Sequence, residues 1–309
     1  MRVLVTGAAG FVGRALVERL RGEAEPSSRL VALDRSFAQA PAAWRDDARL
    51  ELVEGDFGDA AVLDHALAEP PARVFHLASI PGSLAEREPA LGLRVNLLAS
   101  IELLTRLAAL PRAPRLVFAS SVAVYGALPA DGAIDEDQPL APLLSYGAHK
   151  QMLEVLIADA SRRGEIDGIS LRLPGIVARP AQPSGHGSAF MSELIRRTAA
   201  GERYDCPVSA EARCWWMSLP CCIDNLLHAA TLAPQRLAAS RAVQLPVLSA
   251  TTGEVAAAAA HGRGVLPQWR SEPAIEALFG RMPPLHTPRA RALGFACDGD
   301  LARLVRRAL

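Results

Sequence analysis

The stretch that decides the fold opens the chain and reads Arg2-Val3-Leu4-Val5-Thr6-Gly7-Ala8-Ala9-Gly10-Phe11-Val12-Gly13. Residues 2–6 are β-branched or aliphatic for the most part, which is typical of a buried strand. An amphipathic segment at residues 14–21 follows the last glycine and predicts a helix. The stretch therefore predicts a strand, a turn with the spacing Gly-x-x-Gly-x-x-Gly, and a helix in direct succession.

This turn is suited to the pyrophosphate of a dinucleotide. Gly7, Gly10 and Gly13 permit a tight bend, a close approach of the backbone to phosphate, and close packing of helix on strand. The helix start then offers unpaired N–H groups and the positive end of its dipole. A glycine-rich turn alone is a weak signal, and an ordinary tight turn is the alternative. The position between strand and helix favours a dinucleotide site that includes Phe11 and Val12.

Composition excludes several classes of function. The chain has 309 residues, half of them apolar, which is enough for one dominant domain or a domain with a lobe. Its formal net charge is zero, so we expect neither nucleic acid nor a membrane surface as a partner. No apolar run approaches transmembrane length, and because a strand is predicted at residues 2–6 we expect no signal peptide. Five scattered cysteines without Cys-x-x-Cys spacing predict neither disulfides nor a metal site and fit the cytoplasm.

Strands and helices alternate through the first part of the chain. Beyond the opening strand, buried strands are predicted at residues 29–34, 50–56, 73–78, 114–121 and 168–173, with helices at 59–68, 89–110 and 143–163. This alternation predicts βαβ units with right-handed crossovers and a parallel sheet covered by helices on both faces. The expected fold class is α/β, a Rossmann-type doubly wound parallel sheet with a smaller C-terminal substrate lobe.

The pattern changes after Pro174, where proline and glycine become frequent. Helices are predicted at residues 188–200, 219–231, 252–261 and 300–309, and a strand at 242–247. We expect residues 1–175 to form the dinucleotide-binding domain and residues 176–309 the substrate-binding lobe. Parts of residues 215–250 are expected to return to the first domain.

Asp34 points to the kind of dinucleotide. It ends the second predicted strand about 20 residues past the last glycine, where a carboxylate accepts both ribose hydroxyls of the adenosine. A 2′-phosphate would be repelled there, so NAD is favoured over NADP, although Arg35 next to it weakens the choice. A strand-end cap is the alternative role for Asp34. Asp56 ends the third strand and is a candidate for the adenine amino group, with a turn-forming acid before Gly58 as a nearly equal alternative.

Tyr146 and Lys150 lie one turn apart on one face of a predicted helix. A phenol has a pKa of about 10, too high for a base at neutral pH, but an ammonium beside it and a positive nicotinamide above it favour the phenolate. The tyrosine can then take a hydroxyl proton while hydride leaves the same carbon. Ser121 ends the fifth strand, at the edge where open α/β sheets bind ligands, and can orient the substrate oxygen. Strand-end serines that satisfy backbone groups are the alternative.

With these motifs the sequence resembles the extended short-chain dehydrogenase/reductase superfamily, the group of nucleotide-sugar epimerases and dehydratases. The matches lie at residues 6–13, Asp34, Asp56, His76-Leu77-Ala78, Asn96, residues 120–126, Tyr146 and Lys150. The resemblance implies bound NAD(P), Ser121 and Tyr146 as acid/base partners, and Lys150 on the nicotinamide ribose. It implies a homodimer through helices 89–110 and 143–163. The further cofactor contacts that it implies are Phe57, Leu77, Ala78, Ser79, Asn96 and Pro174.

Two departures separate the chain from nucleotide-sugar enzymes of this superfamily. Val122 and Ala123 stand where the dehydratases carry Asp-Glu, so no acid is in place to expel water. Gly175 stands where the epimerases usually have an asparagine on the substrate diphosphate. The remaining pattern resembles dehydrogenases that oxidise the C2 hydroxyl of a four-carbon aldonic acid to the 2-keto acid. It lies at residues 77–89, 171–177, 183–190 and 214–218. A nucleotide-sugar epimerase and a non-catalytic NAD-binding protein are the alternatives.

A small sugar acid needs one or two fixed donors for its carboxylate, such as an arginine fork or a nest of amides. The candidate substrate residues are Ser83, Ser121, Val122, Tyr146, Gly175, Arg179, Ser184, Ser188 and Arg213. Arg179 is otherwise a solvated loop cation, and Arg213 otherwise stacks on the two tryptophans after it. Ser184 and Ser188 belong to a glycine-rich segment that either folds over a ligand or forms a surface loop.

Overall fold

A computed structural model describes residues 1–23, 27–129, 132–180, 187–260 and 265–309 of the chain. The strands of the first part are β1 (Arg2–Thr6), β2 (Arg29–Asp34), β3 (Leu50–Glu54), β4 (Arg73–His76), β5 (Arg115–Ser121) and β6 (Asp167–Leu173). The helices between them are α1 (Phe11–Glu23), α2 (Ala60–Ala66), α3 (Gly82–Arg87), α4 (Pro89–Gly92), α5 (Ala99–Ala108) and α6 (Ser145–Arg162), with short 3-10 turns η1 (Ala42–Trp44) and η3 (Val122–Val124).

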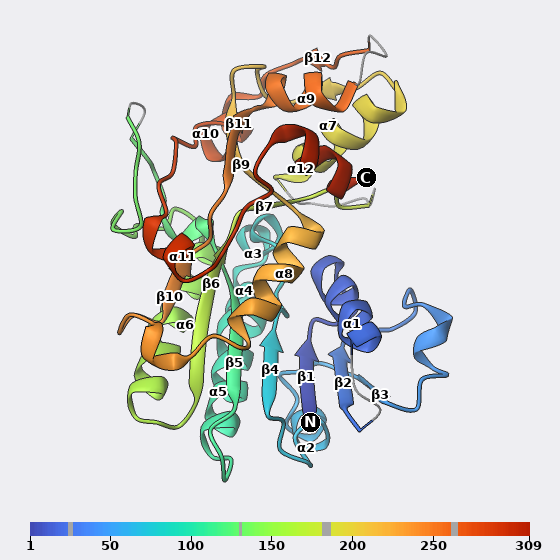
Figure 1. Cartoon of the computed structure of the whole chain (residues 1–309), viewed down its shortest axis with the longest axis vertical. Helices are drawn as coiled ribbons and strands as arrows, with labels where there is room; N and C mark the ends of the chain where they lie inside the picture. Colours follow the sequence, from blue (N-terminus) through green and yellow to red (C-terminus); the bar gives the residue numbers. More distant parts are fainter. Residues whose placement is uncertain (24–26, 130–131, 181–186, 261–264) are drawn as a thin grey trace.

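These strands form a parallel sheet in the order β10-β6-β5-β4-β1-β2-β3, in which β10 (Ala242–Gln244) is contributed from late in the chain (Figure 1). The direction of winding reverses between β1 and β4, which is the point where doubly wound sheets bind ligands. The predicted α/β, Rossmann-type fold is confirmed. The strand predicted at residues 242–247 is shorter than expected and pairs with β6.

Helices cover both faces of the sheet, which explains why its strands are almost continuously apolar. On one face α1 packs with α8 (Leu219–Ala229) through Leu16, Cys222 and Leu226. On the other face α2, α5 and α6 pack through Leu63, Leu103, Leu107, Leu153 and Ile157. The helix predicted at residues 89–110 forms as three consecutive helical segments. The middle segment, η2 (Leu93–Leu98), is a π-helix between α4 and α5.

A second sheet lies beyond the carboxyl ends of these strands, in the order β11-β9-β7. Its strands are β7 (Gly175–Val177), β9 (Arg213–Ser218) and β11 (Leu248–Thr251), and β8 (Asp205–Cys206) pairs separately with β12 (Gln268–Trp269). The remaining helices are α7 (Ala189–Ala200), α9 (Thr252–Ala260), α10 (Pro273–Phe279), α11 (Pro288–Ala292) and α12 (Leu301–Ala308), with the 3-10 turn η4 (Pro234–Arg236). Among the described residues, none of the helices combines the length and apolar character that a membrane crossing needs.

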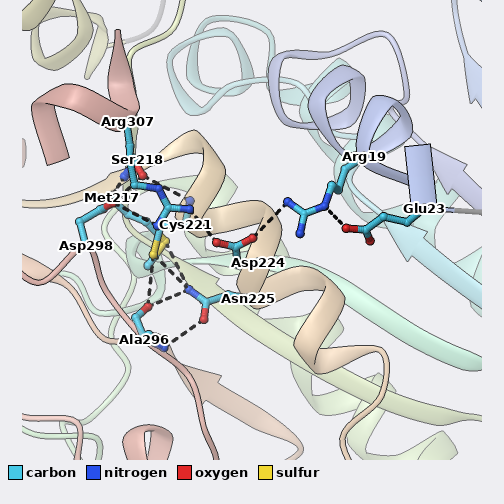
Figure 2. Close-up of polar contacts among 10 residues, drawn as sticks. All are labelled: Arg19, Glu23, Met217, Ser218, Cys221, Asp224, Asn225, Ala296, Asp298 and Arg307. Atoms are coloured by element: carbon cyan, nitrogen blue, oxygen red, sulfur yellow. Dashed lines mark hydrogen bonds and ion pairs between the residues drawn. The ribbon is translucent and has the colours of Figure 1, made fainter. Parts of the chain in front are cut away.

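The end of the chain is fastened across α8 by polar contacts (Figure 2). The buried carboxylate of Asp298 accepts bonds from the backbone N–H of Ser218 at 2.7 Å and from its hydroxyl at 2.5 Å. Asn225 on α8 exchanges hydrogen bonds of 2.8 and 3.1 Å with the backbone of Ala296. Asp224 pairs with Arg19 of α1 at 3.4 Å and with an arginine of α12 at 2.6 Å. These contacts join α1, α8 and α12 into one unit.

We predict that Asp298→Ala lowers the free energy of unfolding by about 2–4 kcal/mol, because it leaves two buried donors of Ser218 without their acceptor. Asp224→Ala is the matched control, since its ion pairs are partly exposed and should contribute no more than about 1 kcal/mol. Urea denaturation followed by circular dichroism measures both variants. Equal loss of stability in the two variants would contradict the special contribution of the buried Asp298 carboxylate.

Candidate active site

A cavity of about 960 Å³ lies between the carboxyl ends of the central strands and the second sheet. The strand ends contribute Gly7 after β1, Leu77 after β4 and Ser121 at the end of β5. The wall on the other side comes from Met191 of α7 and Trp215 of β9, together with residues of α10. The cavity therefore lies where the strand order predicts a ligand.

The glycine turn forms one end of this cavity and fits a dinucleotide. Gly7 has a φ of +70°, and a Cβ there would lie 2.7 Å from the backbone nitrogen of Ala78. A Cβ on Gly13 would lie 2.0 Å from the carbonyl oxygen of Gly7. Gly10, Phe11 and Val12 complete the turn and line the cavity together with Gly7 and Gly13. A bare backbone at the start of α1 thus faces the cavity, as phosphate binding requires.

Asp34 lies at the end of β2 beside this turn. Its carboxylate accepts the N–H of Ala9 at 2.9 Å through one oxygen and the N–H of Arg35 at 2.7 Å through the other. Asp34 therefore fastens the glycine turn to the neighbouring strand. A carboxylate has about four lone-pair sites, so two bonds leave acceptor capacity for ribose hydroxyls.

Tyr146, Ser121 and Lys150 come together at the other end of the cavity. The hydroxyl of Tyr146 is hydrogen-bonded to the side chains of Ser79 and Ser121. Ser121 Oγ also accepts the N–H of Ala123 at 3.1 Å and so caps η3, which fixes the serine rotamer. The structure brings together the three residues that the sequence assigns to catalysis.

The charge state of Tyr146 is set by opposing influences. Burial raises the pKa of the Tyr146 phenol, whereas hydrogen bonds from Ser79 and Ser121 and the charge of Arg179 lower it. Lys150 lies below the ring, with its Nζ 5.4 Å from the ring centroid. Lys150 is the cation that was expected beside the phenol. Arg179 is a second cation, and its charge lowers the pKa of the Tyr146 hydroxyl.

Lys150 is buried against the end of β5. Its Nζ donates a hydrogen bond to the carbonyl of Ala119 at 2.8 Å and lies 4.7 Å from the ring centroid of Phe118. Burial lowers the pKa of Lys150 to about 7, and the charge of Glu154 opposes this effect. The lysine is therefore held at the border between its charged and neutral forms near neutral pH.

His76 takes no part in this chemistry although it lies at the end of β4. Its two ring nitrogens are hydrogen-bonded to Thr6 Oγ1 at 2.7 Å and to Ser100 Oγ at 2.9 Å. Burial lowers its pKa to about 3, so the ring is neutral at physiological pH. His76 links β1, β4 and α5 in the core.

Arg179 and Ser83 are the two sequence-predicted substrate residues with unfilled bonding capacity. Both line the cavity. Arg179 Nε and Ser83 Oγ are buried and have no hydrogen-bond partner within the described residues. The Arg179 guanidinium lies 5.5 Å from the ring centroid of Phe11, between the glycine turn and Tyr146. Of the nine buried side-chain polar atoms that lack a partner in the described residues, these two are the ones whose residues line the cavity, where a polar ligand can supply the bond.

Most of the other predicted residues also line the cavity, namely Leu77, Ser79, Val122, Pro174, Gly175 and Ser188. Ser184 lies outside the described residues. Arg213 does not line the cavity, because β9 pairs with β11 and directs its guanidinium to the carbonyl of Ser249 at 3.5 Å.

Five predicted cofactor contacts also lie outside the cavity lining, namely Asp34, Asp56, Phe57, Ala78 and Asn96. Asp56 accepts the N–H of Gly58 and pairs with Arg94 at 2.8 Å. Asn96 is buried and bonds both backbone groups of Ile80, which shapes the loop after β4.

Several residues that line the cavity were not predicted from the sequence. Arg14 and Gln39 lie beside the glycine turn, and Arg14 donates to the Gln39 carbonyl at 3.2 Å. Helix α7 contributes Met191 and Ser192, α10 contributes Leu278 and Phe279, and the segment after α10 contributes Arg281 and Met282. No local pattern marks these residues, because only the folding of the later segments over the strand ends brings them there.

Residues 3–216 match the NAD dependent epimerase/dehydratase family. The chain is 39% identical to D-erythronate dehydrogenase of Cupriavidus necator, over 99% of this chain and 97% of that protein. It is 31% identical to D-erythronate dehydrogenase of Haemophilus influenzae, over 99% and 98% of the two chains. The fold matches the nucleoside-diphosphate-sugar epimerase from Agrobacterium tumefaciens with a TM-score of 0.89 at 30% identity, covering 99% of this chain and 92% of that one.

These matches confirm the resemblance predicted from the motifs, and they agree with the choice of NAD that Asp34 favours. The chain therefore belongs to the NAD-dependent epimerase/dehydratase family and is an NAD-dependent oxidoreductase that acts on a CH–OH group.

Proposed function

We propose that this protein is an NAD-dependent dehydrogenase of a small sugar acid, which oxidises the C2 hydroxyl of D-erythronate or a similar aldonate to the 2-keto acid. One observation carries the proposal, namely the buried Arg179 Nε, which has no hydrogen-bond partner among the described residues and belongs to a guanidinium whose charge lowers the pKa of the Tyr146 hydroxyl. In an aldonate the C2 hydroxyl is directly attached to the carbon that bears the carboxylate. A cation next to the base therefore selects a hydroxyl at that position. The names of the two D-erythronate dehydrogenases support the same substrate class.

The residues of the cavity divide the task between them. The glycine turn and Asp34 would hold the adenosine and pyrophosphate, and Lys150 the nicotinamide ribose. When bound, NAD supplies the acceptor for the hydride that leaves C2. Tyr146 removes the proton of the C2 hydroxyl as a phenolate, and Ser121 holds the oxygen as it becomes a carbonyl. Arg179 and Ser83 fix the carboxylate and a further oxygen of the acid.

The second candidate is a nucleotide-sugar epimerase, which the name of the Agrobacterium neighbour favours. Gly175 argues against it. Glycine carries no amide that could contact a substrate diphosphate, and the methyl group of Met191 occupies the position next to it, 2.4 Å from where a Cβ would lie. An epimerase returns the hydride to its substrate and accumulates no NADH, whereas a dehydrogenase forms one NADH for each acid oxidised. Absorbance of NADH with D-erythronate and with UDP-sugars separates the two.

We predict that Tyr146→Phe lowers kcat with D-erythronate by about 10²- to 10⁴-fold, because the variant lacks the group that accepts the proton. The affinity for NAD, measured by titration calorimetry, should stay within about twofold, because the hydroxyl does not bind the adenosine or pyrophosphate. Near-normal turnover by the variant would remove Tyr146 from the mechanism.

We predict that Arg179→Gln lowers kcat/KM for D-erythronate by about 10- to 100-fold, the value of one charge-assisted hydrogen bond. Arg213→Gln is the matched control, because it removes the same charge outside the cavity and should leave kcat/KM unchanged. Steady-state kinetics of both variants gives the two values of kcat/KM. Loss of activity in Arg213→Gln with retention in Arg179→Gln would reverse the assignment.

We further propose a homodimer formed through α6 and η2. The two helices are neighbours in the fold and carry apolar side chains that are 37–64% exposed. These residues are Leu93, Leu98, Met152, Val155 and Leu156. Apolar side chains gathered on adjacent helices mark an interaction surface, and a second copy of the chain offers the matching face.

We predict that Val155→Glu converts the protein from a dimer to a monomer, because a charge at the centre of an apolar interface leaves it buried and unpaired. Leu266→Glu, at an exposed leucine outside α6 and η2, should leave the dimer intact. Size-exclusion chromatography with light scattering gives the mass of each. A monomeric unmodified protein would refute the dimer.

A further inference from the structure

One face of α6 continues beyond the reactive pair. Tyr146, Lys150 and Glu154 follow at intervals of four residues, so their side chains lie along a single face of the helix. Lys150 is also the only lysine of the chain, since 32 of its 33 Lys and Arg residues are arginines. A lysine shifts its pKa readily when buried, whereas an arginine stays charged. The one side chain of this kind thus lies directly below the proposed base.

Glu154 fastens this face of α6 to the strands behind it. Glu154 is 4% exposed, and its carboxylate accepts the Ser120 hydroxyl at 2.5 Å and the Arg172 guanidinium at 2.8 and 3.1 Å. Arg172 on β6 is 9% exposed and also donates to the hydroxyl of Tyr125 at 3.1 Å. Because Ser120 directly precedes Ser121, the carboxylate holds the end of β5 against α6.

Stability alone gives little reason for this buried ion pair. Removing two charges from water costs several kcal/mol for each ion, and well-packed apolar residues of similar size are often as stable or more stable. The position of the pair suggests another role. Glu154 lies one turn from Lys150, which is 2% exposed, and among the described residues it is the carboxylate whose charge favours the ammonium form.

The other titratable groups around Lys150 in the described residues include no carboxylate. They are His76 on β4, His149 and Tyr146 on α6, and Arg172 on β6. Burial lowers the pKa of both histidines, so both are neutral, and burial raises the pKa of the Tyr146 phenol. Arg172 is bound to the Glu154 carboxylate at 2.8 Å.

We propose that Glu154 is a positioning residue for the reaction, which favours the ammonium form of Lys150 and holds this side chain in register with Tyr146 and Ser121. Ser120 and Arg172 in turn fix the Glu154 carboxylate. The inference rests on the proposed function only in so far as Lys150 serves that reaction. It differs from a purely structural role, because the carboxylate acts on the proton of Lys150 and not merely on the fold.

The single lysine permits a direct test. Protein labelled with [ε-¹³C]lysine gives one lysine signal, whose chemical shift reports the protonation of Lys150. In the double variant Glu154→Gln/Arg172→Met, which removes both members of the ion pair and leaves Lys150 without its carboxylate, the titration midpoint should fall by at least about one pH unit relative to the unmodified protein. Glu154→Gln alone should give a larger fall of the midpoint, because the positive charge of Arg172 then has no carboxylate partner. This single variant replaces the double variant if the latter does not fold. An unchanged midpoint overturns the proposal.

A matched control removes a second arginine–carboxylate pair between the same two strands. Arg115 on β5 and Asp167 on β6 pair at 2.6 Å at the opposite ends of these strands, away from the cavity. The double variant Arg115→Met/Asp167→Asn should leave both the Lys150 midpoint and kcat unchanged. An equal shift of the midpoint in this control would show that general loosening of the sheet causes the effect.

Activity gives a second readout. The alkaline limb of the kcat profile with D-erythronate should move to lower pH by the same amount as the Lys150 midpoint. At a pH above both midpoints, kcat of the Glu154→Gln/Arg172→Met variant should then be about tenfold lower, with little change in KM for the acid. An unmoved limb would count against the proposal. If the unmodified protein oxidises no sugar acid, the proposed function fails, whereas the lysine titration still decides this inference.

Discussion

The burial of Lys150 between α6 and the end of β5 is the constraint on which the site depends. A buried amine needs an acceptor and a compensating charge, and the carbonyl of Ala119 and the carboxylate of Glu154 supply them. Both partners fix α6 against the last residues of β5. The same register brings Ser121 to the hydroxyl of Tyr146. The geometry of the proposed base therefore follows from how one cation is accommodated in the core.

The sheet order supplies the other half of the site. Reversal of the winding between β1 and β4 leaves a space at the strand ends, with the glycine turn on one side and Tyr146 on the other. The second sheet then closes this space. Its residue Gly175 packs against Met191, which fills the room that a larger side chain would take and leaves Arg179 facing Tyr146. We propose that this packing restricts the dinucleotide-binding scaffold to a small acidic substrate.

Local patterns predicted the glycine turn and the strands up to β6, because each depends on neighbours within a few turns of the chain. Local patterns also singled out Ser121, Tyr146 and Lys150, which the structure brings to one cavity. Non-local features were not predictable. β7, β9 and β11 are short and pair across long separations, and the lining residues of α10 carry no motif. Arg179 and Arg213 look alike in sequence, and only strand pairing shows that Arg213 faces away. Asn96 matches a family position, yet its side chain holds the Ile80 loop and does not line the cavity.

The fate of the hydrogen on C2 tests the central claim most directly. With D-[2-²H]erythronate and NAD, the account predicts that deuterium appears in the reduced cofactor in amounts equal to the 2-keto acid formed, as mass spectrometry would show. Deuterium that stays in the sugar acid, or reduced cofactor that forms without deuterium, would contradict oxidation at C2.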